Sequence, residues 1–251
     1  MFARGQCYYE LNQSEKSLKI LIHLRADPTF GPSASLFAGT LHMKVHRAED
    51  AAMDFEIGLR HENIKQETKI ELKYRLANTY AQMQNVGEAL RLFEELHREQ
   101  PGYWDVESQM GRYRELSLNT HLQTYLLGGT SEFVTLCRKL ASMFFPQAVV
   151  KVVDISVNKN DYADILAEVS TDRWDDVVLY RFLRSSSRTG DLSLRDMHAR
   201  IKEVKAGRGF CVNAGGFSET AQQFVEARLI DLVDKEPLIE MFNRITTWAP
   251  N

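Results

Sequence analysis

The 251-residue sequence predicts a multidomain protein in which an all-α solenoid of helical-hairpin repeats precedes an α/β domain with a mixed sheet flanked by helices. Two observations lead to this fold class. Small residues recur at nearly constant spacing through the first half, which is typical of stacked helical hairpins. After Gly129, β-branched runs alternate with amphipathic helical segments. We therefore expect two domains, at residues 1–127 and 131–251.

The composition is that of an ordinary globular protein, with 44% hydrophobic and 26% charged residues. A net charge of −3 gives no global reason to expect a nucleic-acid or membrane partner. Cys7, Cys137 and Cys211 lack metal or redox spacing, so we expect buried free thiols in a reducing compartment. No signal peptide or bilayer-length apolar run is visible, and we expect a cytoplasmic protein.

The repeat is clearest in "LANTYAQMQNVGEALRLFEEL" at 76–96. Its pattern is a small residue, a second small residue twelve positions on, and a large residue four further. Three segments share these offsets: Gly5, Ser17 and Leu21; Gly39, Ala51 and Phe55; Ala77, Ala89 and Phe93. The small residues allow the two helices of one hairpin to approach closely. We expect the large residues Phe55 and Phe93 to fill the groove toward the neighbouring repeat.

This pattern resembles the tetratricopeptide repeat, and Pro28 and Pro101 fall where such a repeat ends. The resemblance implies a concave groove that binds a protein or peptide partner, and a helical spacer without a ligand is the alternative. Residues 106–127 are expected to form a closing helix or the first helix of a degenerate fourth repeat. Because the first helix starts almost at Met1, we expect either that further repeats precede it or that the chain is a fragment.

The second half predicts the order α-β-β-β-α-β-α-β-α, which indicates a mixed sheet with helices packed on it. Its expected helices are residues 131–145, 193–206, 218–229 and 236–245. Its expected strands are residues 148–157, 162–170, 176–184, 207–215 and 230–234. The longest characteristic stretch is "GRGFCVNAGGFSETAQQFVEARLIDLVDKEPLIEMF" at 207–242. With this stretch, residues 131–245 resemble the catalytic domain of Mrr-type restriction endonucleases, within the PD-(D/E)xK nuclease superfamily.

The resemblance implies a restriction-endonuclease-like fold and assigns the family's first acid, catalytic and metal-binding, to Asp164. The family's Q-x-K or E-x-K positions fall at Arg181 and Leu183, which share a strand face because they are two residues apart. Cleavage requires carboxylates that hold Mg²⁺ and a lysine beside them. Lys202 or Lys205 would have to supply a migrated lysine. We therefore expect that catalysis is lost and that no cofactor is needed, Mg²⁺ being implied only if the chain is a nuclease.

Residues 181–208 contain eight basic and three acidic residues. The candidate nucleic-acid-binding residues are Arg184, Arg188, Arg195 and Lys202. The alternative is an ordinary solvated helix preceded by a mobile loop at 184–190. His42 and His46 have the four-residue spacing of some zinc ligands, but without a third ligand nearby we expect a solvated pair.

Two functions remain open at this stage. The leading one is a protein-interaction or scaffold protein with an inactive nuclease-like domain. The other is an Mg²⁺-dependent DNA endonuclease, or a DNA-binding relative, with a displaced active site. The enzyme requires a second carboxylate and a lysine close to Asp164, whereas loss of catalysis predicts that Leu183 packs in the core and that Arg181 is paired or exposed. DNA binding without cleavage predicts that the four basic residues form one continuous face.

Overall fold

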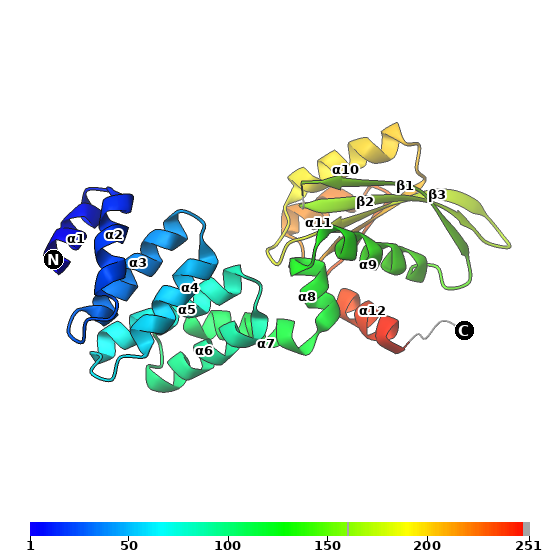
Figure 1. Cartoon of the computed structure of the whole chain (residues 1–251). Helices are drawn as coiled ribbons and strands as arrows, with labels where there is room; N and C mark the ends of the chain where they lie inside the picture. The colour runs from blue at the N-terminus through cyan, green and yellow to red at the C-terminus, as the bar shows by residue number, and fades with distance from the viewer. Residues whose placement is uncertain (160, 248–251) are drawn as a thin grey trace. The chain divides into compact units, whose positions relative to one another are not determined.

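The computed structural model describes residues 1–159 and 161–247 (Figure 1). The chain divides into two compact units, Met1–Leu118 and Asn119–Asn251. Within the described residues, no helix combines the length and the apolar character that a membrane span needs. Each unit has its own core.

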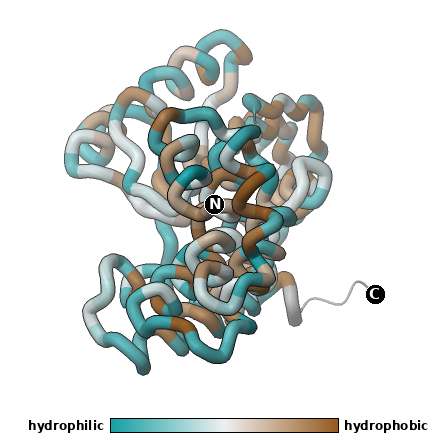
Figure 2. Tube along the Cα trace, turned by 60° about the vertical axis from the view of Figure 1, so that its left-hand side comes forward, coloured by the Kyte–Doolittle hydropathy of each residue, from teal (hydrophilic) through white to brown (hydrophobic). Residues whose placement is uncertain are grey.

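The first unit is an array of helical hairpins. Its helices are α1 (Phe2–Glu10), α2 (Ser14–Leu24), α3 (Gly31–Lys44), α4 (Ala48–Leu59), α5 (Gln66–Gln82), α6 (Val86–Glu99) and α7 (Val106–Leu118). Each helix packs against the next, so that α1–α2, α3–α4 and α5–α6 are hairpins and α7 packs on α6. Hydrophobic and hydrophilic residues alternate along these helices (Figure 2), as in amphipathic helices that bury one face. The all-helical repeat region predicted from the spacing is confirmed.

The small residues of the repeat allow close contact inside a hairpin. A Cβ atom added to Gly39 would lie 2.4 Å from the ring of Phe55, so α3 and α4 can approach only because position 39 has no side chain. Phe55 therefore fills the space within its own hairpin, and its expected role toward the next repeat stays a prediction. Phe93 does face its neighbour, since its ring stacks on Tyr113 of α7 with centroids 5.7 Å apart.

A buried charged cluster joins the first two hairpins. Asp54 is fully buried in α4, and its Oδ2 lies 2.8 Å from Nδ1 of His42. Its other oxygen accepts a hydrogen bond from Arg25. A buried carboxylate is stable only with such partners. The expectation of a solvated histidine pair is thus wrong for His42, whereas His46 lies in the turn after α3 with a positive φ of 58°.

The second unit is a mixed five-stranded sheet with helices on both faces. Its helices are α8 (Thr120–Leu127), α9 (Thr130–Met143), α10 (Asp191–Glu203), α11 (Glu219–Val225) and α12 (Lys235–Thr247). Its strands are β1 (Val149–Asn158), β2 (Tyr162–Ser170), β3 (Asp175–Leu183), β4 (Arg208–Asn213) and β5 (Ile230–Val233). The strands lie in sequence order, with β1, β2 and β3 antiparallel and β3, β4 and β5 parallel. The predicted element order is confirmed.

Residues 106–127 form two helices rather than the single helix expected. Asn119 interrupts them, because its side chain accepts a hydrogen bond from the backbone N–H of Leu122 at 2.9 Å and caps α8. In α8, the fully buried Tyr125 packs edge-on against Phe133 of α9 and Phe242 of α12. Residues 119–127 therefore fold with the second unit, which starts at residue 119 rather than at the expected residue 131.

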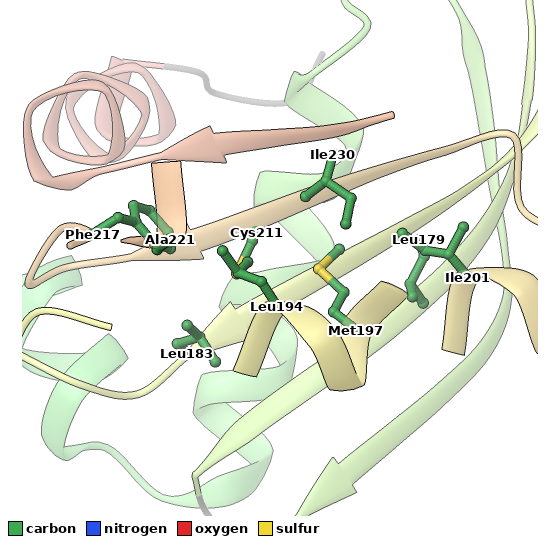
Figure 3. Packing of buried hydrophobic residues seen from close by; sticks show 9 residues of the cluster. All are labelled: Leu179, Leu183, Leu194, Met197, Ile201, Cys211, Phe217, Ala221 and Ile230. Atoms are coloured by element: carbon green, nitrogen blue, oxygen red, sulfur yellow. The ribbon is translucent and has the colours of Figure 1, made fainter. Parts of the chain in front are cut away.

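The two faces of the sheet carry different cores. On one face, Phe144 at the end of α9 packs on Tyr180 of β3. On the other face, α10 and α11 cover an apolar cluster (Figure 3). The members of this cluster are Leu179, Leu183, Leu194, Met197, Ile201, Cys211, Phe217, Ala221 and Ile230. Cys211 and Cys137 are buried free thiols as expected, but Cys7 is exposed. The residues that the nuclease resemblance singled out lie on the face covered by α10.

Candidate functional site

A buried ion pair occupies the position that the nuclease resemblance assigns to the metal. The antiparallel register of β2 and β3 places Asp164 directly opposite Arg181. Nε of Arg181 donates to Oδ1 of Asp164, and Nη2 donates to Oδ2, both at 2.7 Å. The Arg181 side chain is only 1% exposed and that of Asp164 is 7% exposed. The guanidinium thus engages both oxygens of the carboxylate in the bidentate geometry that binds carboxylates most strongly.

The rest of the guanidinium is also held. Nη1 of Arg181 donates to the backbone oxygen of Ser193 at 3.2 Å and to Oδ2 of Asp196 at 2.6 Å. Its Cζ atom lies 4.2 Å from the ring centroid of Tyr162, a cation–π contact. Burial alone disfavours the charged form, but the hydrogen bonds that Arg181 donates to Asp164 and Asp196, and the negative charge of Asp164, outweigh it and raise the pKa of Arg181. Arg181 is therefore a permanent buried cation at this site.

Leu183 is part of the hydrophobic core. It lies two residues beyond Arg181 on the same face of β3, and only 6% of it is exposed. Figure 3 shows it among the apolar side chains between the sheet and α10. The lysine that the family carries at this position would have to place an ammonium group in that apolar layer. The structure therefore packs Leu183 and pairs Arg181, as loss of catalysis predicts.

Asp196 is a site residue that the sequence did not reveal. It lies on α10, beside the buried stripe of Leu194, Met197 and Ile201, and its side chain is 64% exposed. Helix packing alone brings it to the end of the Arg181 guanidinium. The sequence offers one signal for Asp196. It stands beside the buried stripe, four residues before Arg200 and on the same side of the helix. The guanidinium of Arg200 lies 3.7 Å from Asp154 of β1, which extends the charged cluster toward the sheet edge.

This cluster is built around a guanidinium. Two carboxylates, those of Asp164 and Asp196, converge on Arg181, whereas a nuclease site needs carboxylates that converge on Mg²⁺. Among the residues that the structure describes, no group of three or more His, Cys, Asp or Glu is placed to hold a metal ion. The enzyme's requirement for a second carboxylate is met by Asp196, but the cation beside Asp164 is an arginine.

Neither candidate for a migrated lysine is seen to contact Asp164 within the described part of the chain. Lys202 is exposed on α10, where it lines a pocket with His198 and Arg228 on the other side of the buried stripe. Lys205 is exposed in the turn after α10, with a positive φ of 57°.

The four basic residues proposed for nucleic-acid binding do not form one face. Arg184 donates to the backbone oxygen of Gly128 at 2.6 Å and lies over the ring of Phe133, on the α9 side of the sheet. Arg195 and Lys202 lie on α10, on the opposite side. The continuous face that DNA binding without cleavage predicts is therefore not formed, because Arg184 points to the α9 side of the sheet whereas α10 covers the other side. Arg188 is exposed in the loop before α10.

That loop is tied to the turn after β4. The buried Asn213 donates to the backbone oxygens of Ser187 and Gly216, at 3.0 and 2.6 Å, and to the hydroxyl of Thr189. Thr189 also forms a bridge with Phe217. The loop at 184–190, expected to be mobile if the basic segment was only a solvated surface, is therefore held at several points. Asn213 explains the "NAGGFS" stretch as a packing turn.

A comparison with protein families agrees with the architecture of the second unit. A family model described as "Restriction endonuclease" (Mrr_cat) matches residues 132–242. No curated protein matches the chain. Among solved structures, one similar chain comes from "Molecular features of the UNC-45 chaperone critical for binding and folding muscle myosin", at 15% identity and a TM-score of 0.40. That match covers 56% of this chain and 17% of the other. Residues 132–242 thus form an Mrr-type restriction endonuclease domain, which follows a helical repeat region.

Proposed function

We propose that this chain is a protein-interaction or scaffold protein whose nuclease-like domain does not cleave DNA. The observation that carries the proposal is the bidentate pair of Arg181 and Asp164. Mg²⁺ takes oxygen ligands at about 2.0–2.1 Å, so a metal at Asp164 would have to displace the guanidinium from the same oxygens. Arg181 is buried beside Asp164. A metal ion that bound there without displacing the guanidinium would be repelled by its positive charge in a medium of low polarity.

The second element of the chemistry is missing for a different reason. Hydrolysis needs a group that orients the attacking water and neutralises charge in the transition state. Leu183 supplies neither, and the core that surrounds it excludes water from that position. The domain would then act as a folded module, and no metal cofactor is required.

A plasmid-nicking assay tests the loss of activity. Supercoiled DNA is incubated with the wild-type chain and with Asp164→Ala, in Mg²⁺ and in Mn²⁺, after thermal unfolding has shown that both samples are folded. We expect no metal-dependent nicking from either protein. Nicking by the wild type that disappears in Asp164→Ala would overturn the proposal.

Exposed aromatic side chains on the repeat region support partner binding. Trp104 is 68% exposed, yet its ring is held by Tyr74 and Tyr103 at centroid distances of 5.1 and 5.6 Å. Its φ of 45° is unusual for a bulky residue, and such conformations cluster at functional positions. Tyrosine and tryptophan dominate the energetic centres of protein interfaces. We place a protein or peptide partner on this aromatic surface of the first unit.

Affinity purification with quantitative mass spectrometry tests the partner surface. The wild-type chain is compared with Trp104→Ala and with Met53→Ala, which removes a similarly exposed apolar side chain from α4. We expect a set of proteins that is lost with Trp104→Ala and retained with Met53→Ala. Equal recovery with both variants would contradict docking at Trp104.

A second candidate, an Mg²⁺-dependent DNA endonuclease with a displaced active site, rests on one observation. The carboxylates of Asp164 and Asp196 both lie within hydrogen-bonding distance of one guanidinium, so movement of Arg181 would leave two acids facing a shared space. The same nicking assay separates the candidates when Asp196→Asn is included. The endonuclease predicts nicking that both Asp164→Ala and Asp196→Asn abolish, and DNA would then be the partner.

A further inference from the structure

A pocket of about 490 Å³ lies on the α10 side of the second unit, away from the Asp164 cluster along the helix. It is bounded by the last turns of α10, the turn before β4 and the segment between α11 and β5. Ile201 and Ile230 line it and belong to the apolar cluster of Figure 3. His198, Lys202 and Arg228 line it as well. The pocket thus combines an apolar floor with three nitrogen-bearing side chains.

The three side chains are held close together by the fold. His198 and Lys202 are four residues apart on α10, so they lie one above the other on one helix face. Phe224 of α11 contacts both Arg228 and His198. The Arg228 Cζ atom lies 3.8 Å from its ring centroid, and the His198 ring meets it edge-on with centroids 6.2 Å apart. Arg228 also donates to the backbone oxygen of Phe224. Burial lowers the pKa of His198, and the charges of Lys202 and Arg228 lower it further.

The positive charge of this pocket is not neutralised by carboxylates in the described residues. Neither Lys202 nor Arg228 forms an ion pair there. Glu203, the neighbour of Lys202 in sequence, pairs instead with Arg200 at 2.9 Å. Asp176 lies against the rim at Gly207, and its Oδ1 accepts the N–H of the next residue. Two cations and an imidazole therefore line the pocket, and Arg228 keeps one Nη group and its Nε for a ligand because, in the described part of the chain, only its Nη1 donates to Phe224.

We propose that this pocket binds a small organic anion of the phosphomonoester class. The phosphate lies between Lys202, Arg228 and His198, and the apolar part of the ligand packs on Ile201 and Ile230. Arginine and lysine are the residues that bind phosphate oxygens most strongly, through charge-assisted hydrogen bonds. The volume falls in the range of about 300–1,000 Å³ that small-molecule sites occupy. The site is independent of nuclease chemistry and of the partner surface at Trp104.

The test is a titration of the full chain with phenyl phosphate, followed by NMR. The imidazole resonances of His198 and the backbone amides of residues 198–207 and 227–230 report on the pocket. We expect saturable shifts confined to these residues, and weaker binding of inorganic phosphate, which lacks the apolar group. Phenol, which lacks the phosphate, should give no saturable shift. Binding of phenol as tight as that of phenyl phosphate would overturn the assignment of an anion site.

Two variants make the test specific. Lys202→Ala removes an exposed charge from the pocket without disturbing the core, and we expect its affinity for phenyl phosphate to fall by about tenfold, the loss of one charge-assisted hydrogen bond. Lys139→Ala removes an exposed lysine from α9, on the opposite face of the sheet, and should bind like the wild type. Equal weakening in both variants would show that net charge alone attracts the probe, and would refute the pocket.

A third arm separates this ligand class from a nucleic acid. A short single-stranded oligonucleotide is titrated under the same conditions, and Arg188→Ala is added because its side chain lies outside the pocket. The proposal is wrong if phenyl phosphate gives no saturable shift while the oligonucleotide shifts residues well beyond the pocket. If Arg188→Ala also weakens oligonucleotide binding, the surface binds polyanions. Confined shifts with phenyl phosphate support it.

Discussion

At the scale of single residues, the decisive feature is the buried ion pair of Arg181 and Asp164. Arg181 contributes a charge that cannot be titrated away at any ordinary pH, and Asp164 contributes the matching carboxylate. Both side chains are almost fully buried, so each depends on the other for the compensation of its desolvation. A replacement of either residue by one that could serve a metal site would therefore also change the stability of the sheet.

This dependence predicts a non-additive pair of mutations. Arg181→Leu or Asp164→Leu alone should lower the free energy of unfolding by about 3–5 kcal/mol, because the first leaves the buried Asp164 without its bidentate partner and the second leaves Arg181 only the exposed Asp196. The double variant should recover most of that loss, since a well-packed apolar pair replaces a buried ion pair at little cost. Urea denaturation of the four proteins gives the coupling energy. Additive losses would show that the two side chains do not act as a unit.

The site could be predicted from the sequence only where strand geometry decides it. The two-residue spacing of Arg181 and Leu183 placed both on one face, and that placement is confirmed. The same alternation puts Arg184 on the face opposite Arg181, the face that α9 covers. Asp196 could not be found in this way, because no local pattern says which helix residue will reach a strand side chain after packing.

At the scale of secondary-structure elements, small residues set the spacing of the helical hairpins. Gly39 is the clearest case, because the ring of Phe55 occupies the space where its side chain would be. The periodic pattern was enough to predict these hairpins. It did not predict the break at Asn119, because the apolar periodicity continues through 106–127 and only the capping side chain ends one helix and begins another.

Two glycines in helices make a matched test of this spacing. Gly39→Ala should lower the free energy of unfolding by about 1–3 kcal/mol, because its Cβ collides with a fully buried ring. Gly111→Ala in α7 meets nothing within 4 Å and should raise stability by up to about 1 kcal/mol through helix propensity. Thermal or urea unfolding of the two variants checks the sign. If Gly39→Ala raised the stability, the contact between Gly39 and the Phe55 ring would not limit the spacing of α3 and α4.

At the scale of the whole molecule, the chain joins two units with separate cores. The helical unit is stabilised by contacts between neighbouring helices, and the second unit by two apolar layers on a single sheet. The fold class of both parts could be predicted from sequence because it depends on periodicity. The boundary between them could not, because it depends on where Tyr125 is buried rather than on where the pattern changes.

The position of the boundary can be tested by truncation. A fragment of residues 119–251 should unfold cooperatively, whereas one that starts at residue 128 loses α8 and the buried ring of Tyr125. Removal of a buried aromatic side chain costs about 3–5 kcal/mol, so the shorter fragment should be strongly destabilised or unfolded. Circular dichroism and thermal melting distinguish the two. Equal melting temperatures would place α8 outside the second unit.

The ion pair of β2 and β3 also bears on how this domain can change over generations. The family's Q-x-K or E-x-K pattern would require that Arg181 give way to an acid or amide and that Leu183 give way to lysine. The first replacement alone strands a buried carboxylate, and the second alone puts an ammonium group into an apolar layer. Either single replacement therefore gives a sequence that folds poorly. The ion pair of Arg181 and Asp164 is therefore easier to keep than to replace, because its replacement needs two simultaneous changes.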